Sequence, residues 1–298
     1  MATPSDFAIE IDASGLGVLT FEPNQGPMVI LDKPLIQRLE TTLKTLPSDL
    51  AGLVLASGSP RVFIAGADLK SIMAMSHTEL EDYLAYGQQV FGMLCKLPFP
   101  TVAAIAGAVL GGGLELAMHC DGLIAANPPV KNGQSGRPYP VGLPEAGLAI
   151  CPGWGGTNLL PARMNAAEAI RRICTGQTMM VGEAHAAGVF DAFTQDAAAV
   201  VDVAKAWLKA NAKLHAGRAD GQPLRWIGRP AFSDLAAAAA ADLAAVVLTD
   251  EAGACLKAVR AGLAGGWENA LAVERTELNR LRAAPAGQER IAAFFSKK

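Results

Sequence analysis

The sequence predicts an α/β chain in which a mainly parallel sheet is followed by a helical C-terminal part. Short apolar strands alternate with helical segments over the first half of the chain, and this order implies parallel strands joined by crossover helices. Beyond residue 166, helical patterns follow one another almost throughout. We therefore expect a core domain at residues 1–200 and a helical region at residues 201–298.

The N-terminal segments begin with a hairpin and a helix. Apolar and polar residues alternate on both sides of Ser14-Gly15, which predicts two paired strands. Between Pro34 and Leu46, leucine and isoleucine recur at helical spacing. The apolar run from Leu53 to Ala56 then fits a buried strand.

The next segments again alternate between predicted helices and strands. Asp68 is a candidate N-cap for a helix that starts near Leu69. Residues 79–97 have helical periodicity, and Thr101 to Ile105 fits a strand. A helix then opens at three consecutive glycines, Gly111 to Gly113, and runs to Met118.

The remaining segments are a loop and a series of helices. Residues 127–140 contain four prolines and no apolar period, which predicts an exposed loop. The expected helices are residues 166–174, 182–188, 197–212, 232–248, 250–262 and 267–295.

Composition excludes several classes of protein. The chain has 298 residues, 51% of them hydrophobic and 18% charged, with a formal net charge of −3. A chain of this length and hydrophobicity can bury a full core, which excludes a disordered or disulfide-stapled protein. The chain has 25 Lys and Arg residues and 28 Asp and Glu residues, so it has no excess of positive charge that would attract a polyanion. We therefore expect no nucleic-acid or membrane partner.

The cysteines and the N-terminus indicate a cytoplasmic protein. Five cysteines occur without a CxxC pair, as expected of reduced, buried thiols. The first residues have neither a basic n-region nor an apolar h-region, so no secretory signal is expected. Leu97 to Leu114 is uncharged, but its prolines and glycines favour a buried strand and a turn over a membrane span.

Several common catalytic motifs are missing. The sequence contains no G-x-S-x-G elbow and no phosphate-binding P-loop, and its four histidines are scattered. The glycines at 111–113 follow a strand, but the G-x-G-x-x-G spacing of dinucleotide-binding proteins is absent. Serine-triad, zinc and dinucleotide chemistry are therefore not indicated.

Two glycine turns and two glutamates remain as candidate chemistry. Ala65 to Asp68 and Gly111 to Gly113 each place backbone N–H groups at the start of a helix, where an anionic oxygen is stabilised. If the two turns converge, they form an oxyanion hole. Glu115 and Glu145 lie in apolar sequence, which raises the pKa of a carboxyl group and allows proton exchange near neutral pH. The alternative is structural, with Glu115 as a first-turn residue favoured by the helix dipole.

The combination of these motifs resembles the crotonase, or enoyl-CoA hydratase/isomerase, superfamily. The resemblance is carried by three blocks in family order, Ser57 to Lys70, Pro98 to Asp121 and Gly142 to Thr157. It extends more weakly over most of the chain from residue 9 onward. Gly142-Leu-Pro-Glu145 and the C-terminal stretch look most like the hydratase portion of the alpha subunit of fatty-acid oxidation complexes.

The resemblance implies a fold, a reaction and a set of site residues. The fold would be a crotonase (ClpP-like) spiral of ββα turns with a helical trimerisation region, assembled as a homotrimer or a dimer of trimers. The reaction would convert a 2-trans-enoyl-CoA into a 3-hydroxyacyl-CoA without metal or redox cofactor, coenzyme A being part of the substrate. The implied residues are Glu115 and Glu145 as catalytic acid and base, the N–H groups of Ala67 and Gly112 as oxyanion hole, and Ala65, Gly66, Asp68, Gly111 and Trp154 in substrate binding.

Three departures from the family pattern qualify these expectations. Glu145 follows Glu115 by 30 positions, a longer interval than in the family, because of the proline-rich segment. Trp154 replaces a small residue, so its indole either projects into the acyl site or packs outward against residues 127–140. Asn158-Leu159 replaces a Gln-Arg pair and puts in doubt any ion pair made there.

Two alternative functions stay open. A Δ3,Δ2-enoyl-CoA isomerase would need only one of the two glutamates. An RNA-binding or scaffold relative would need no catalysis, although the acidic composition disfavours RNA binding.

Overall fold

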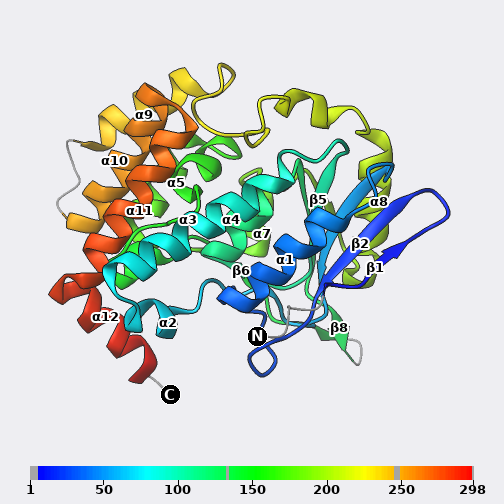
Figure 1. Cartoon of the computed structure of the whole chain (residues 1–298), viewed down its shortest axis with the longest axis horizontal. Helices are drawn as coiled ribbons and strands as arrows, with labels where there is room; N and C mark the ends of the chain where they lie inside the picture. The colour runs from blue at the N-terminus through cyan, green and yellow to red at the C-terminus, as the bar shows by residue number, and fades with distance from the viewer. Residues whose placement is uncertain (1–5, 132–133, 245–248, 297–298) are drawn as a thin grey trace. The chain divides into compact units, whose positions relative to one another are not determined.

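The computed structural model, drawn in Figure 1, describes residues 6–131, 134–244 and 249–296. The chain divides into two compact units. Unit 1 comprises Met1–Gly66, Gln89–Val141 and Met179–Leu224. Unit 2 comprises Ala67–Gln88, Gly142–Thr178 and Arg225–Lys298. Each unit is thus assembled from three separate stretches, and the division at residue 200 stays a prediction.

Unit 1 is built on a six-stranded sheet with the order β1-β2-β3-β5-β7-β12. β1 is antiparallel to β2, and all other neighbouring pairs are parallel. The strands are β1 (Ile9–Ile11), β2 (Leu16–Phe21), β3 (Gly52–Ser57), β5 (Thr101–Ile105), β7 (Gly122–Ala126) and β12 (Ala192–Thr194). The predicted hairpin and the predicted parallel pairing are confirmed.

One face of this sheet forms a core with helix α8 (Val200–Ala210). Alternate residues of four neighbouring strands point to this face, as the two-residue period of a strand requires. The strand residues are Leu16, Val18, Val54, Ala56, Val102, Ala104, Ile124 and Ala126. α8 contributes Val200, Ala204 and Leu208, which recur at helical spacing.

A second sheet of unit 1 has the order β11-β10-β6-β4. Its strands are β4 (Val62–Ile64), β6 (Ala108–Leu110), β10 (Pro140–Gly142) and β11 (Met179–Met180). The other helical segments that lie wholly in this unit are α1 (Lys33–Thr45), α4 (Gly112–Met118), α7 (Val181–Ala186), η3 (Ala197–Ala199) and η4 (Leu214–Arg218), while α3 (His77–Leu94) contributes to both units. The segment Leu97 to Leu114 contains β5 and the start of α4, as predicted, and a second strand, β6, which was not predicted.

The segment at residues 127–140, expected to be an exposed loop, contains a short ribbon and a buried side chain. β8 (Val130–Lys131) pairs with β9 (Gln134–Ser135) in a short antiparallel ribbon, and residues 132–133 lie outside the described residues. Tyr139 is buried, and its hydroxyl donates to the carbonyl oxygen of Ala126 at 2.7 Å. The prolines interrupt periodicity without preventing this local pairing, which involves only two residues on each strand.

A buried ion pair in unit 1 binds the backbone of the segment that precedes β5. The side chain of Arg218 is 1% exposed and donates to both carboxylate oxygens of Asp121, at 2.6 and 2.9 Å. The same guanidinium donates to the carbonyl oxygens of Cys95, Leu97 and Phe99. It thereby gives hydrogen bonds to three backbone carbonyl oxygens just before β5. Leaving such groups buried without a partner would cost free energy.

Unit 2 is mainly helical. Its segments are α2 (Leu69–Ala74), η1 (Glu145–Leu148), α5 (Gly156–Leu159), η2 (Leu160–Ala162), α6 (Ala166–Thr175), α9 (Ser233–Ala244), α10 (Asp250–Gly265), α11 (Trp267–Ala283) and α12 (Pro285–Ser296). α10 packs along α11 and beside α9 (Figure 1). It also contacts α6.

The helical C-terminal stretch differs from its prediction in its last helix. The single helix expected at residues 267–295 is interrupted at Ala284, because α12 begins with Pro285, and proline is suited to the first position of a new helix. Two short strands, β11 and β12, lie in the gaps that the prediction left between helices, at residues 175–181 and 189–196. Residues 245–248 of the predicted helix 232–248 lie outside the described residues.

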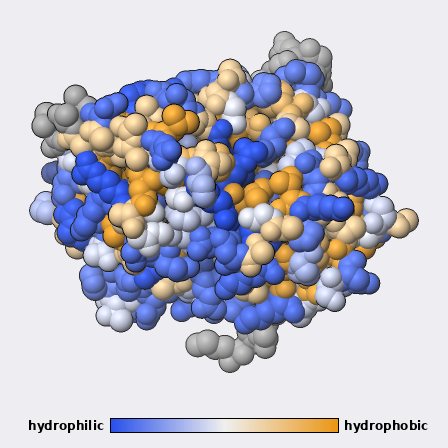
Figure 2. Space-filling model, turned by 90° about the horizontal axis from the view of Figure 1, so that it is seen from above, coloured by the Kyte–Doolittle hydropathy of each residue, from blue (hydrophilic) through white to orange (hydrophobic). Residues whose placement is uncertain are grey.

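The surface carries few large exposed hydrophobic side chains among the described residues. They are Ile11, Met28, Met180, Leu235 and Phe294. Figure 2 shows that the face it draws mixes apolar patches with hydrophilic residues. No helix in the described ranges is long and apolar enough to cross a membrane.

Candidate functional site

The second turn, Gly111 to Gly113, and the first half of the other, Ala65-Gly66, lie in unit 1, while Ala67 and Asp68 belong to unit 2. β4 ends at Ile64 and leads into Gly66, which has a φ of +121°, while β6 leads into Gly111, which has a φ of +52°. These left-handed values favour glycine. A Cβ atom added at Gly66 would lie 3.4 Å from the carbonyl oxygen of Leu110. Within unit 1, the backbone at Gly66 therefore lies close to the backbone at Leu110.

Helix α4 begins directly at the second turn. A Cβ atom at Gly113 would lie 2.5 Å from the carbonyl oxygen of Ile64, so only glycine lets the helix start approach the end of β4. The N–H of Gly112 belongs to the first turn of α4 and has no acceptor within the helix. It is thus available, by its position in the helix, for an anionic oxygen.

Glu115 lies in the first turn of α4 and is 1% exposed. Every residue of this helix is buried, because α4 packs against β4, β5, β6 and β7. His119 caps the helix, and its Nδ1 lies 2.8 Å from the backbone oxygen of Glu115. Burial lowers the pKa of His119 to about 4, so this imidazole is neutral at physiological pH.

In unit 2, Ala67 and Asp68 precede helix α2. Asp68 is its N-cap, as predicted, and accepts hydrogen bonds from the N–H groups of Lys70 and Ser71. The hydroxyl of Ser71 donates to the second carboxylate oxygen at 2.6 Å. The capping role of Asp68 is confirmed. Substrate binding by Ala65, Gly66, Asp68 and Gly111, and the oxyanion-hole role of Ala67 and Gly112, stay predictions.

Glu145 is the first residue of η1 and lies in unit 2. The residue is half-buried, but its Oε2 atom is fully buried and has no hydrogen-bond partner among the described residues. Burial raises the pKa of Glu145 to about 8, and the negative charge of Glu274 acts in the same direction. A carboxyl group in this state holds a proton at neutral pH and can donate it.

The backbone around Glu145 is held in an unusual conformation. Ala149, which ends η1, has a φ of +57° and is the one non-glycine residue with positive φ in the described part of the chain. Gly176, at the end of α6, packs so closely on Gly147 that an added Cβ atom would overlap the Gly147 nitrogen. The segment that carries Glu145 is therefore fixed by tight packing on α6.

Trp154 lies in the turn from Pro152 to Thr157 and is 2% exposed. Its indole packs edge-on against Tyr83, with the ring centres 5.5 Å apart, and its Nε1 donates to the carbonyl oxygen of Leu84 at 3.1 Å. Gly87 leaves space for the ring, since a Cβ atom there would overlap the indole. These contacts are all to α3, and the role of Trp154 in substrate binding stays a prediction.

Glu274 was not anticipated from the sequence. It lies on α11, 0% exposed, and its carboxylate accepts hydrogen bonds from the backbone N–H groups of Gly155 and Thr157 at 2.5 and 3.0 Å. The sequence does contain a signal for it. Glu274 continues the apolar stripe of α11, Trp267, Ala270, Leu271, Leu278 and Leu281, and an acid at such a position is buried.

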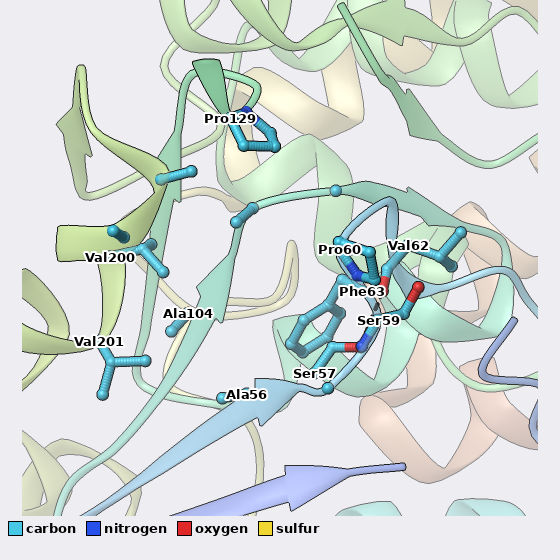
Figure 3. A pocket seen from close by; sticks show the side chains of 15 residues that line it. Ala56, Ser57, Ser59, Pro60, Val62, Phe63, Ala104, Pro129, Val200 and Val201 are labelled. Atoms are coloured by element: carbon cyan, nitrogen blue, oxygen red, sulfur yellow. Dashed lines mark hydrogen bonds between the residues drawn. The ribbon is translucent and has the colours of Figure 1, made fainter. Parts of the chain in front are cut away.

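Unit 1 also contains a cavity of about 360 Å³ that none of the predicted site residues lines (Figure 3). It lies where β3 and β5 end, and Figure 3 shows Ala104 beside Val200 and Val201, with Ala56 and Ser57 further along the lining. The hydroxyl of Ser57 already donates to the carbonyl oxygen of Val62 at 2.7 Å. The described residues that line it are small or apolar, and none of them has an ionisable side chain.

The described residues also bear on metal and thiol chemistry. Within the described ranges, no three His, Cys, Asp or Glu side chains are grouped so that they could hold a metal ion. All five cysteines are free and buried, which confirms the prediction of buried thiols.

Comparisons with known proteins identify the family. The family model of enoyl-CoA hydratase/isomerase matches residues 14–221. The fatty acid oxidation complex subunit alpha of Vibrio cholerae serotype O1, in two strains, is 38% identical over 175 residues. This match covers 58% of the chain but 23% of the relative, so the chain spans less than a quarter of the length of these relatives.

Solved structures share the fold. Human mitochondrial Δ3,Δ2-enoyl-CoA isomerase matches with a TM-score of 0.69 and 21% identity, covering 98% of both chains. Enoyl-CoA hydratase from Bacillus anthracis matches with a TM-score of 0.61 and 22% identity, covering 99% of this chain and 97% of the other. The predicted crotonase fold class is thereby confirmed. Together with the family model, it shows that the chain belongs to the enoyl-CoA hydratase/isomerase family.

Proposed function

We propose that the chain is an enoyl-CoA hydratase that adds water across the double bond of a 2-trans-enoyl-CoA and releases a 3-hydroxyacyl-CoA. The observation that carries the proposal is the Glu145 carboxyl, whose buried Oε2 has no hydrogen-bond partner within the described ranges and whose pKa is raised. Such a group is suited to giving a proton to carbon. The second acid, Glu115, is also buried, so the chain retains both groups that hydration uses.

The two glutamates would divide the reaction between them. Glu145, protonated at neutral pH, supplies the proton to C2 of the substrate. Glu115 accepts a proton from water as the oxygen attacks C3, and the neutral state of His119 leaves no positive charge at the end of α4 that would oppose this protonation. Each transfer by a positioned acid or base contributes roughly 10²–10⁴-fold to the rate.

The thioester oxygen would be stabilised by the two glycine turns. Negative charge develops on this oxygen when C3 is attacked, and the N–H groups of Ala67 and Gly112 would donate to it. The close approach of Gly66 to Leu110 and the start of α4 at Gly112 support this assignment. Preorganised donors of this kind are worth about 3–4 kcal/mol each in related hydrolytic sites.

The substrate class also follows from the family. The Vibrio cholerae relatives are named as subunits of a fatty acid oxidation complex, which supports a fatty acyl thioester in a β-oxidation type of reaction. Coenzyme A would enter as part of the substrate, and the proposed steps use no metal or redox cofactor. A homotrimer or a dimer of trimers is the proposed assembly.

Isomerisation of a 3-enoyl-CoA is the alternative reaction. It requires one acid that moves a proton between two carbons, and Glu145 has the environment for that task. Activity assays with matched 2-enoyl-CoA and 3-enoyl-CoA substrates distinguish the two. The hydratase proposal expects water addition to the 2-enoyl substrate to be the faster reaction. A chain that converts only the 3-enoyl substrate is an isomerase.

A further inference from the structure

Two buried cysteines of unit 2 lie at the contact between α6 and α10. Cys174 is in the last turn of α6, and Cys255 is in the second turn of α10. The Cys174 thiol donates to the carbonyl oxygen of Ala252 at 3.6 Å, and the Cys255 thiol donates to that of Ile173 at 3.9 Å. Each sulfur atom therefore lies against the backbone of the other helix, and the Cys255 sulfur contacts the residue directly before Cys174.

The two side chains also contact each other. A hydrogen bond joins the thiols of Cys174 and Cys255. Both cysteines are free in the structure, so the pair is in its reduced state. The S–S bond of a disulfide is about 2.05 Å long, and two sulfur atoms that are already in contact need only a small approach to reach that length.

The two cysteines differ in their access to solvent. Cys174 is 6% exposed, whereas Cys255 is 0% exposed. A small oxidant such as hydrogen peroxide therefore reaches Cys174 first. Cys255 needs no access of its own, because it reacts with the neighbouring sulfur and not with the oxidant.

Cys174 is also the better nucleophile of the two. A thiol has one proton, so Cys255 donates it either to the Ile173 carbonyl oxygen or to the Cys174 sulfur. The second hydrogen bond favours the ionised form of Cys174 and lowers its pKa, while burial acts in the opposite direction. The same contact and burial raise the pKa of Cys255 well above its ordinary value. Because the thiolate is the nucleophile, the first step of an oxidation falls to Cys174.

A third buried thiol of unit 2 provides a comparison. Cys151 is 0% exposed, and its thiol donates to the backbone oxygen of Glu274, on α11, at 3.8 Å. It lies outside the pair of reciprocal contacts that joins Cys174 and Cys255. We therefore expect Cys151 to stay reduced when the pair is oxidised.

We propose that Cys174 and Cys255 form an oxidation site, at which hydrogen peroxide produces a reversible disulfide between α6 and α10. In the first step the Cys174 thiolate attacks one peroxide oxygen. The S–O bond forms, the O–O bond breaks, and the other oxygen leaves as hydroxide and takes up a proton to give water. This proposal does not depend on the proposed hydratase activity.

The second step forms the disulfide. The Cys255 sulfur attacks the sulfenic acid of Cys174, so that the S–S bond forms and the S–O bond breaks. The hydroxyl group leaves with the Cys255 proton as a second water. Two thiols and one peroxide thus give one disulfide and two waters, and two electrons pass from the sulfur atoms to the peroxide.

Peptide mapping of the full chain tests the proposal. Trypsin places Cys174 in residues 173–205 and Cys255 in residues 226–257, and each of the other three cysteines lies in a different peptide. The reduced chain is treated with hydrogen peroxide, its remaining thiols are alkylated, and it is digested without reductant. We expect these two peptides as a linked pair, two hydrogens lighter than their sum, which separates on addition of dithiothreitol. Of the five thiols in the denatured chain, three should remain.

Serine variants and dimedone, which labels sulfenic acids, test the order of the two steps. In Cys255→Ser the sulfenic acid cannot be resolved, so dimedone should label residues 173–205. Cys174→Ser should form neither the link nor a labelled Cys255. Cys151→Ser is the matched control and should form the link as the parent chain does.

Three results overturn the proposal. They are absence of the linked pair in the oxidised parent chain, a link between a different pair of cysteines, and dimedone labelling of Cys255 in Cys174→Ser. If the serine variants do not fold, the peptide map of the parent chain decides between a linked and an unlinked pair by itself.

Discussion

Replacing Trp154 with alanine separates the packing role of the indole from a role in the acyl site. The side chain is fully buried against Tyr83 and Gly87, and its Nε1 donates to the Leu84 carbonyl. Truncation of a buried tryptophan to alanine costs about 3–5 kcal/mol through lost contacts and the cavity left behind. At about 2–4 °C of Tm per kcal/mol for domains of 150–250 residues, Tm should fall by roughly 6–20 °C.

Two measurements are needed, thermal unfolding and the dependence of kcat/KM on acyl-chain length. Because the described contacts of Trp154 are to α3, Trp154→Ala should lower Tm and leave the chain-length profile unchanged. Trp154→Phe is the control: it keeps an aromatic ring against Tyr83 and loses the hydrogen bond, which is worth about 1 kcal/mol. The reasoning is refuted if Trp154→Ala keeps the parent Tm but gains activity toward C8 or longer enoyl-CoA relative to crotonyl-CoA.

Three further predictions concern the fold and its assembly. Gly176→Ala should lower Tm by several degrees and reduce kcat, because the new Cβ atom displaces η1 and Glu145. Alanine in the left-handed conformation of Gly176 costs about 1 kcal/mol in addition. An unchanged Tm and kcat would contradict the packing described. The raised pKa values of Glu145 and Glu274 mean that the native state binds protons more tightly than the unfolded chain, so the free energy of unfolding should fall between pH 6.5 and 8, by at most about 1.4 kcal/mol per pH unit and group. The lowered pKa of His119 has the opposite effect on the free energy of unfolding, but only below the ordinary histidine pKa of 6.5. Urea unfolding at pH 6.5 and pH 8 measures the change, and a higher free energy of unfolding at pH 8 would contradict the prediction. Light scattering at micromolar concentration should show a trimer or hexamer, which would cover exposed apolar side chains such as Leu235 (75% exposed), and a monomer would contradict the assembly.

The elements that could be predicted are those encoded by local patterns. Alternation predicts the hairpin β1 and β2, helical spacing predicts α1, and Asp68 marks the start of α2 because a capping aspartate satisfies the N–H groups of the first turn. β11 and β12 contain two and three residues, too few to show a period. They form strands because of the neighbours with which they pair, and those neighbours are far away in the sequence.

In the candidate site, too, some features follow from local sequence patterns and others depend on partners that are distant in the sequence. The glycine turns and the buried Glu115 follow from short motifs, because tight backbone approach and a helix start are local requirements. The contact between Glu274 and Thr157 joins residues 117 positions apart, and the ion pair of Arg218 with Asp121 joins residues 97 positions apart. No local pattern specifies such a pair of partners, although a charged residue in an apolar stripe indicates that a buried partner exists.

The central claim is that Glu115 and Glu145 act as acid and base in hydration, and crotonyl-CoA hydration by the two glutamine variants tests it most directly. Glutamine keeps the size of the side chain and removes the proton chemistry. Each substitution should lower kcat by at least about 10²-fold while circular dichroism stays like that of the parent. Near-parental turnover in either folded variant would show that the glutamate concerned is structural, and would contradict the proposed mechanism.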